Sequence, residues 1–129
     1  MQRDVSLRMA LTIAEAALAE CGVKTSVAVV DRAGRLRVFL QGDGAAPHNL
    51  ELARRKAYTA RTFRMTTEEF IKALETNPAR RAQTTLPNVI AIPGGVPIKV
   101  GNDVIGGVGV GLVFGAIASA IVGIPAVTR

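Results

Sequence analysis

The sequence predicts an α+β fold, in which an antiparallel sheet of about five strands packs against helices. Strand-like segments occur in pairs separated by short turns, as in β-hairpins. The helical segments are grouped around these pairs and do not alternate regularly with single strands, which argues against a parallel sheet. Nearly half of the 129 residues are apolar, enough for one packed core. We therefore expect residues 1–129 to form a single domain.

An amphipathic helix is expected to begin the chain. Its apolar residues recur at helical spacing: Leu7, Leu11, Ala14, Leu18 and Cys21. Asp4 is placed to cap this helix and Gly22 to end it. Cys21 is the only cysteine, so no disulfide can form within the chain, and we expect it to be a small buried residue of the apolar stripe.

The middle of the chain predicts a hairpin followed by two helices. Residues 27–30 and 36–40 read as strands around a turn at 31–34. Pro47 suits the start of a helix, whose inward residues would be Leu50, Ala53, Ala57 and Ala60. A capping box of Thr66 and Glu69 begins the next helix, which should end near residue 77.

The last third predicts strands. Residues 89–92 read as a short strand, and 96–100 pairs with 104–110 across a tight turn. No charged residue occurs from 104 to 127, which is long enough for a membrane span. The alternation of Gly and Val at 106–111 instead favours a buried strand that leads into a packed helix. We therefore expect no membrane span.

The charge pattern favours small anionic ligands over nucleic acid. The net charge is +6 and the pI is about 10.5. The basic residues do not form one block, and no aromatic stacking platform accompanies them, which argues against a binder of single-stranded nucleic acid. Carboxylates or propionates are the anions expected to be attracted. No apolar signal region precedes the first helix, so we expect a cytoplasmic protein.

The chain contains none of the common catalytic motifs, so we expect a binding protein more than an enzyme. His48, the only histidine, reads either as a solvated residue at a helix start or as an axial ligand to a metal-centred ring. Asp43 is either a turn former or the border of a pocket. Lys56 either pairs with a carboxylate or faces water. Gly94 and Gly95 either make a tight turn or expose N–H groups to a flat ligand.

Five stretches together resemble the GlcG/HbpS family of haem-binding-type proteins, which is similar to the C-terminal domain of PduO-type cobalamin proteins. In chain order they are VAVVDRAG (27–34), GDGA (42–45), RKAYTA (55–60), PGGVPI (93–98) and VIGGVGV (104–110). The resemblance implies a profilin-like fold and homo-oligomers. Some members bind haem or a corrinoid, and others belong to catabolic operons. Tyr58, inside the third stretch, is a further candidate ligand residue.

One departure from the family pattern lies at 111–118. This stretch lacks the acidic residue and the proline that are typical there. An apolar ligand or a buried contact between subunits becomes more plausible than a small polar substrate.

Three functions follow from these observations. The first is a carrier or sensor of haem, with a corrinoid less favoured, in which His48 ligates the metal and Arg54 or Lys56 meets the propionates. The second is an accessory protein or small enzyme of aromatic or hydroxy-acid catabolism, in which His48, Asp43 and Lys56 move protons around a small carboxylate. The third is a structural oligomer that stabilises a partner enzyme.

Overall fold

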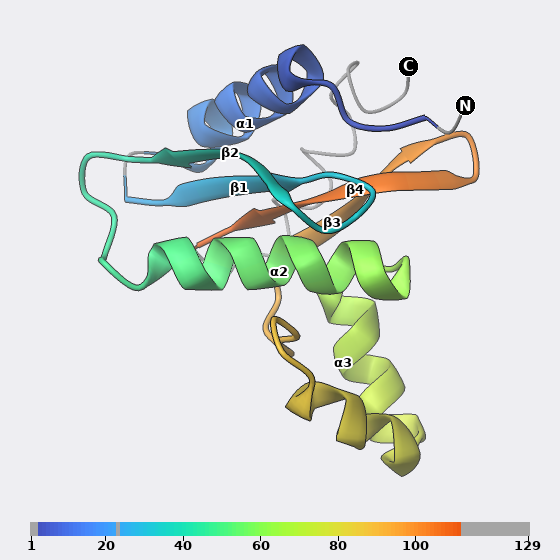
Figure 1. Ribbon diagram of the computed structural model, residues 1–129. Helices are drawn as coiled ribbons and strands as arrows, with labels where there is room; N and C mark the ends of the chain where they lie inside the picture. Colours follow the sequence, from blue (N-terminus) through green and yellow to red (C-terminus); the bar gives the residue numbers. More distant parts are fainter. Residues whose placement is uncertain (1–2, 23, 112–129) are drawn as a thin grey trace.

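The sheet of this protein is antiparallel, and a helix covers each of its faces (Figure 1). The computed structural model describes residues 3–22 and 24–111. In these ranges the sheet has four strands in the order β2-β1-β4-β3. The elements are α1 (Leu7–Cys21), β1 (Ser26–Val30), β2 (Leu36–Gln41), α2 (Asn49–Phe63), α3 (Thr67–Thr76), the 3₁₀ helix η1 (Pro78–Thr85), β3 (Gly95–Val100) and β4 (Asp103–Val110).

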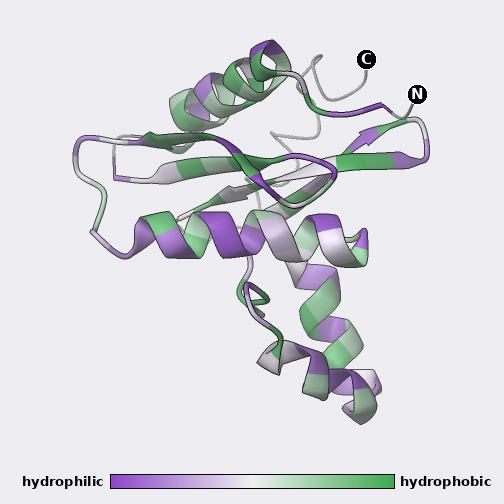
Figure 2. Cartoon of the chain, viewed as in Figure 1, coloured by the Kyte–Doolittle hydropathy of each residue, from purple (hydrophilic) through white to green (hydrophobic). Residues whose placement is uncertain are grey.

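The two faces of the sheet pack in different ways. On the α1 face, valines from the central strands β1 and β4 meet small residues of the helix. The buried cluster there includes Ala10, Ile13, Ala14, Ala17, Val27, Val29, Val108 and Val110. On the α2 face the buried residues of the helix are three alanines, Ala53, Ala57 and Ala60, and three polar residues, Asn49, Lys56 and Thr59. The alanines let the helix backbone approach the sheet closely. Figure 2 colours much of α2 as hydrophilic.

Glycines of β4 form the floor on which α2 lies. A Cβ atom at Gly107 would overlap the carbonyl oxygen of Ala57, and one at Gly109 would overlap that of Ala53. The alternation of Gly and Val therefore directs valines to one face and leaves room for a helix on the other. The prediction of a buried strand is confirmed for β4. The helix and the subunit contact expected after it lie outside the described residues.

Several local predictions are confirmed. The hairpin of β1 and β2 forms, and its turn has Gly34 at φ +79°. Gly22 ends α1 at φ +87°. The Thr66–Glu69 capping box is complete, since each side chain accepts a hydrogen bond from the other residue's backbone N–H. Within the described ranges, no helix has both the length and the apolar character needed to cross a bilayer.

The predicted strand at 89–92 is wrong, and the described sheet has four strands where about five were expected. Side chains of α2 take the backbone groups that a neighbouring strand would use. Thr59 Oγ1 accepts a hydrogen bond from Ile90 N at 2.9 Å, and Arg55 Nη2 donates to the Val89 carbonyl at 2.7 Å. This segment therefore runs along a helix, where it has no ladder to join.

The predicted helix faces also need correction. Ser6, and not Asp4, caps α1, because its side chain accepts from Met9 N. Leu7 is 54% exposed and Leu11 36%, so small residues, and not these leucines, make the contact with the sheet. Leu50 is likewise exposed. Cys21 is only half-buried, at the edge of the α1 core.

Candidate functional site

A buried amine lies where α2 crosses the end of β4. The Lys56 side chain is fully buried, contrary to the solvated position usual for a helical lysine. Its Nζ donates hydrogen bonds to the carbonyl oxygens of Val110, at 3.0 Å, and Gly111, at 3.4 Å. These carbonyls extend from the end of the strand, so they satisfy the ammonium group without a directly bonded carboxylate.

Burial changes the acidity of this amine. Desolvation lowers the pKa of Lys56 to about 8, and the negative charge of Glu68 opposes that change. A charged group transferred out of water favours its neutral form, which for lysine means a lower pKa. At neutral pH the amine is still mainly protonated, yet it lies close enough to its pKa to exchange a proton readily. The acidity of the amine is therefore suited to proton transfer.

The glycines of the 93–95 turn come next to Lys56. A Cβ atom at Gly94, where φ is +120°, would lie 3.2 Å from Lys56 Nζ. Gly94 N donates to Glu68 Oε1 and Gly95 N to Thr67 Oγ1, both at 2.9 Å. The structure thus brings together three of the predicted site residues. Both glycine N–H groups are already bonded within the fold and are not open to a ligand.

Three polar residues around Lys56 were not predicted from the sequence. Thr67 and Glu68 lie between Thr66 and Glu69, the two residues of the capping box. The capping-box pattern predicts where the helix starts, but it does not predict a role for the two residues in between. Asn49, in the first turn of α2, is buried, and its side chain lies against Gly111. The amide of Asn49 and the hydroxyl of Thr67 are buried. The sequence alone does not show this burial, so it contains no signal for these two residues.

His48 lies at the exposed N-terminal end of α2. It occupies the N-cap position without a side-chain hydrogen bond to the helix, and its side chain is exposed. Arg54, further along α2, donates to Glu51 Oε2 and to Asn88 Oδ1, each at 2.9 Å. Both basic groups are therefore nearer to solvent than Lys56.

Asp43 and Tyr58 lie apart from this group. Asp43 is exposed and lines a shallow depression with Leu18 and Gly22 on the α1 side. The Tyr58 ring packs against Gly34 in the β1–β2 turn. The seven predicted site residues are therefore spread over several places. In the described part of the chain, no three His, Cys, Asp or Glu residues are grouped to hold a metal ion, so His48 could supply only a single ligand to a metal already held by a ring.

Comparisons with known proteins agree with this fold. The family described as "Haem degrading protein HbpS-like" matches residues 5–113. GlcG of Escherichia coli strain K12 is 35% identical over 85 residues, which are 66% of this chain and 62% of GlcG. The matched part thus spans less than two thirds of that relative.

Solved structures extend the similarity to nearly the whole chain. The crystal structure of HbpS superposes with a TM-score of 0.84 at 32% identity, covering 97% of this chain and 92% of HbpS. A double mutant of HbpS from Streptomyces reticuli gives 0.82 at 32% identity, covering 94% and 86%. PduOC, solved as a haem complex, shares the fold at 23% identity with a TM-score of 0.75, covering 91% of each chain. With the family match over most of its length, this chain belongs to the HbpS-like family.

Proposed function

We propose that this protein binds haem, or less favourably a corrinoid, as a cytoplasmic carrier or sensor. Membership of a family described as haem degrading supports haem as the class of ligand. The structural observation that carries the proposal is His48, an exposed imidazole without a side-chain hydrogen bond. Imidazole is a common ligand of haem iron. Bound haem would supply an iron centre with a strong visible absorption band.

The surroundings of His48 fit such a ring. Leu50, two positions after His48, is 39% exposed and adds apolar surface at the same end of α2. Arg54 carries its guanidinium near the surface, where it could exchange part of its bonding for a propionate. Arg55 follows His48 by seven positions and so lies on the same helical face. Its buried Nε has no hydrogen-bond partner in the described structure, which is consistent with an acceptor that a ligand would provide.

The test is a haem titration of the purified protein, followed by visible absorption. We expect a saturable band at stoichiometric haem, and a shifted band with affinity at least about tenfold lower in His48→Ala, the loss of one metal ligand. Arg55→Gln should weaken binding less, and Arg37→Gln, an exposed arginine on β2, serves as the matched control. A saturable band unchanged in His48→Ala would keep haem and reject His48. No saturable binding would reject the proposal.

A second function, on a small carboxylate, has one feature in its favour. The buried Lys56 amine, with a pKa of about 8, is suited to general acid–base chemistry. His48 and Asp43, its suggested partners, are exposed and lie apart from it. Turnover of an aromatic or hydroxy acid that Lys56→Met abolishes would favour this function. A set of such acids that leaves the melting temperature unchanged would count against it.

We also propose that this protein forms a homo-oligomer. Such an oligomer could in addition stabilise a partner enzyme. Leu7 and Leu11 are exposed on α1, and exposed leucines on one helix are common at interfaces between subunits. Light scattering of the intact protein measures its mass. A mass that falls to one chain in Leu11→Lys would support this contact, and a wild-type monomer would refute it.

A further inference from the structure

A small basic depression lies at the other end of α2 from His48. It is bordered by the β1–β2 turn and the last two turns of the helix, and its volume is about 280 Å³. The residues that line it include Arg32, Gly34, Tyr58, Arg61, Thr62 and Arg64. Residues 48 and 61 are about 20 Å apart along the helix, at 1.5 Å per residue.

The depression carries more positive charge than its neighbours neutralise. Three of its residues are arginines, and the ion pair at its wall joins Arg32 Nη2 to Asp103 Oδ2 at 2.6 Å. The pKa of Arg61 is lowered by burial first and then by the positive charges of Arg32 and Arg64, against smaller opposing effects of Asp103 and Asp4. Like charges are therefore held close together, which favours binding of a counter-charge.

Donor groups in the depression are unused. Arg61 donates from Nε to the Arg32 carbonyl at 2.7 Å. Over residues 3–22 and 24–111, its Nη groups, the Tyr58 hydroxyl and the Arg64 guanidinium make no hydrogen bond. Guanidinium groups present paired donors that match the oxygens of phosphate or carboxylate. The residues that line the depression therefore carry several donor groups that an anion could use.

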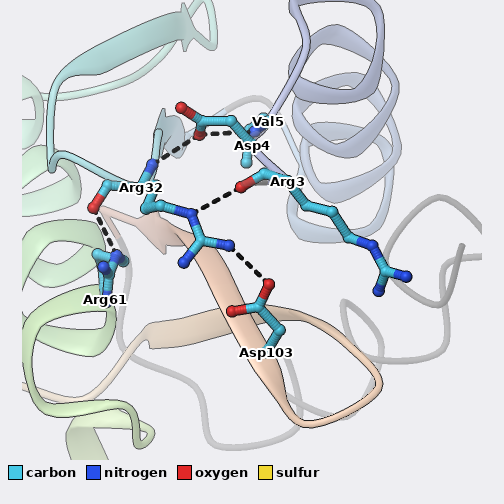
Figure 3. Close-up of polar contacts among 6 residues, drawn as sticks. All are labelled: Arg3, Asp4, Val5, Arg32, Arg61 and Asp103. Carbon is cyan, nitrogen blue, oxygen red and sulfur yellow. Dashed lines mark hydrogen bonds and ion pairs between the residues drawn. The ribbon is translucent and has the colours of Figure 1, made fainter. Parts of the chain in front are cut away.

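Arg32 and Arg61, two of the three arginines of the depression, are held in place by a network that Figure 3 shows. Arg32 N donates to Asp4 Oδ1 at 2.8 Å and Arg32 Nε to the Arg3 carbonyl at 2.6 Å (Figure 3). With the bonds to Asp103 and from Arg61, this residue connects the N-terminal segment, the β1–β2 turn, α2 and β4. A site built on fixed side chains loses less conformational entropy when it binds a ligand.

Tyr58 is fixed as well. A Cβ atom at Gly34 would lie 2.8 Å from Tyr58 Cε2, so the glycine is needed for the ring to lie across the turn. The ring therefore has a defined position, and Tyr58 is one of the residues that line the same depression.

From these observations we infer that the depression is an oxyanion site that takes the phosphate group of a small phosphomonoester or of inorganic phosphate. Within the described ranges, no carboxylate is bonded to the guanidinium groups of Arg61 and Arg64, two of the three arginines of the depression. A dianion would balance these two positive charges better than a monoanionic carboxylate. The site is distinct from the proposed haem ligand, because His48 is about 20 Å away along α2.

The experiment is a titration of the ¹⁵N-labelled protein, followed by amide chemical shifts. Glycerol 3-phosphate and inorganic phosphate are the probes, with acetate as the monoanionic comparison, at about pH 7.5, where a phosphomonoester is a dianion. We expect saturable shifts at Gly34 and Thr62 with both phosphate probes. Tighter binding of the ester than of inorganic phosphate would identify the ester as the ligand, and equal binding would identify the phosphate group alone.

Variants test the assignment to these residues. Arg64→Gln should weaken phosphate binding at least about threefold. Arg61→Gln should weaken it more, because Arg61 is partly buried while Arg64 is exposed, and an exposed side chain makes a weaker ion pair with a ligand. Arg61→Gln also loses the bond to Arg32, so Arg64→Gln and Tyr58→Phe, which keep the described contacts of the fold, guard against a folding defect. Arg37→Gln removes the same charge from exposed β2 and should leave binding unchanged.

Three results would overturn the inference. They are the absence of saturable shifts, equal weakening by Arg37→Gln and Arg64→Gln, and acetate binding as tightly as phosphate. His48→Ala should leave phosphate binding intact while it changes the haem spectrum, so failure of one proposal is distinguishable from failure of the other.

Discussion

The two halves of α2 hold positive charge in opposite ways. Lys56 is fully buried, and within residues 3–22 and 24–111 its ammonium is bonded only to backbone carbonyls. One and a half turns later, Arg61 lies at a partly open wall beside two further arginines and near Asp103. The basic residues of α2 are at positions 54–56 and 61. The surroundings of each one decide whether its side chain is buried and how its charge responds to pH and salt.

The comparison shows how residue type suits each position. A lysine amine can lose its proton when it is desolvated, so the first half of α2 should respond to pH. A guanidinium stays charged, so the second half keeps its charge and should respond to salt and to anions. The glycines under the helix make both situations possible, because they bring the helix close to the sheet.

The largest expected effect comes from filling that floor. Gly109→Ala should push α2 away from β4, since the new Cβ would overlap the Ala53 carbonyl. We expect a loss of about 3 kcal/mol or more in the free energy of unfolding, because backbone cannot move aside as a side chain can. Gly107→Ala makes the same test under the second half of the helix, near Ala57. Urea unfolding measures both.

Gly101→Ala is the matched control for these variants. Gly101 has φ +62°, and a Cβ added to it would meet no atom within 4 Å, so only the backbone preference changes, at about 1 kcal/mol. Equal losses in all three variants would contradict the close approach of α2 as the cause. A much larger loss at Gly109 than at Gly107 would show that the Lys56 half depends more on this contact.

The next effect concerns the charge of Lys56. A pKa lowered from 10.5 to about 8 means that the unfolded chain binds more protons than the folded one between these values. The free energy of unfolding should therefore rise with pH across that window, and the charged amine opposes folding by about 3 kcal/mol at neutral pH. Lys56→Met should remove this rise.

The measurement compares urea unfolding at pH 7 and pH 10. Wild type should gain about 2 to 3 kcal/mol more than Lys56→Met over this interval, while Lys24→Met, an exposed lysine, should follow the wild type. The difference cancels the titration of all other groups. Parallel curves for wild type and Lys56→Met would mean that the amine keeps an ordinary acidity despite its burial.

Much of the fold could be predicted from local patterns. The β1–β2 hairpin, the Thr66–Glu69 cap and the last hairpin each depend on residues close in sequence, and each forms. The strand expected at 89–92 does not form, because side chains 31 and 34 positions away, Thr59 and Arg55, take its backbone groups. No window of sequence around that segment contains this information.

The candidate site was less predictable for the same reason. The sequence marks Lys56 as a candidate, but its burial depends on the end of β4, 54 residues later. The pattern at Gly107 and Gly109 predicts a strand, yet it does not show that these glycines determine how closely α2 lies. The basic depression combines Arg32 with Arg61, 29 residues apart, so charge counting along the chain could not find it.

The smallest expected effect is at the Arg32–Asp103 ion pair, which joins the β1–β2 turn to β4 next to Arg61 of α2. The hydrogen bond from Arg32, with the positive charge of that residue, lowers the pKa of Asp103 below 3.8. The pair therefore stabilises the fold above the unfolded pKa of 3.8, and its contribution disappears as the pH falls through the lower folded value. Because Asp103 is exposed, Asp103→Asn should lower the melting temperature only slightly at pH 7, and this difference should shrink as the pH falls below 3.8.

Asp43→Asn, which removes an exposed carboxylate without a described partner, is the control for net charge. Added salt should reduce the difference between Asp103→Asn and wild type, since exposed charges are screened. The Lys56→Met difference should persist in the same salt, because the amine is buried. If instead both differences vanished with salt, the contrast between the buried Lys56 and the exposed Arg32–Asp103 pair would not hold.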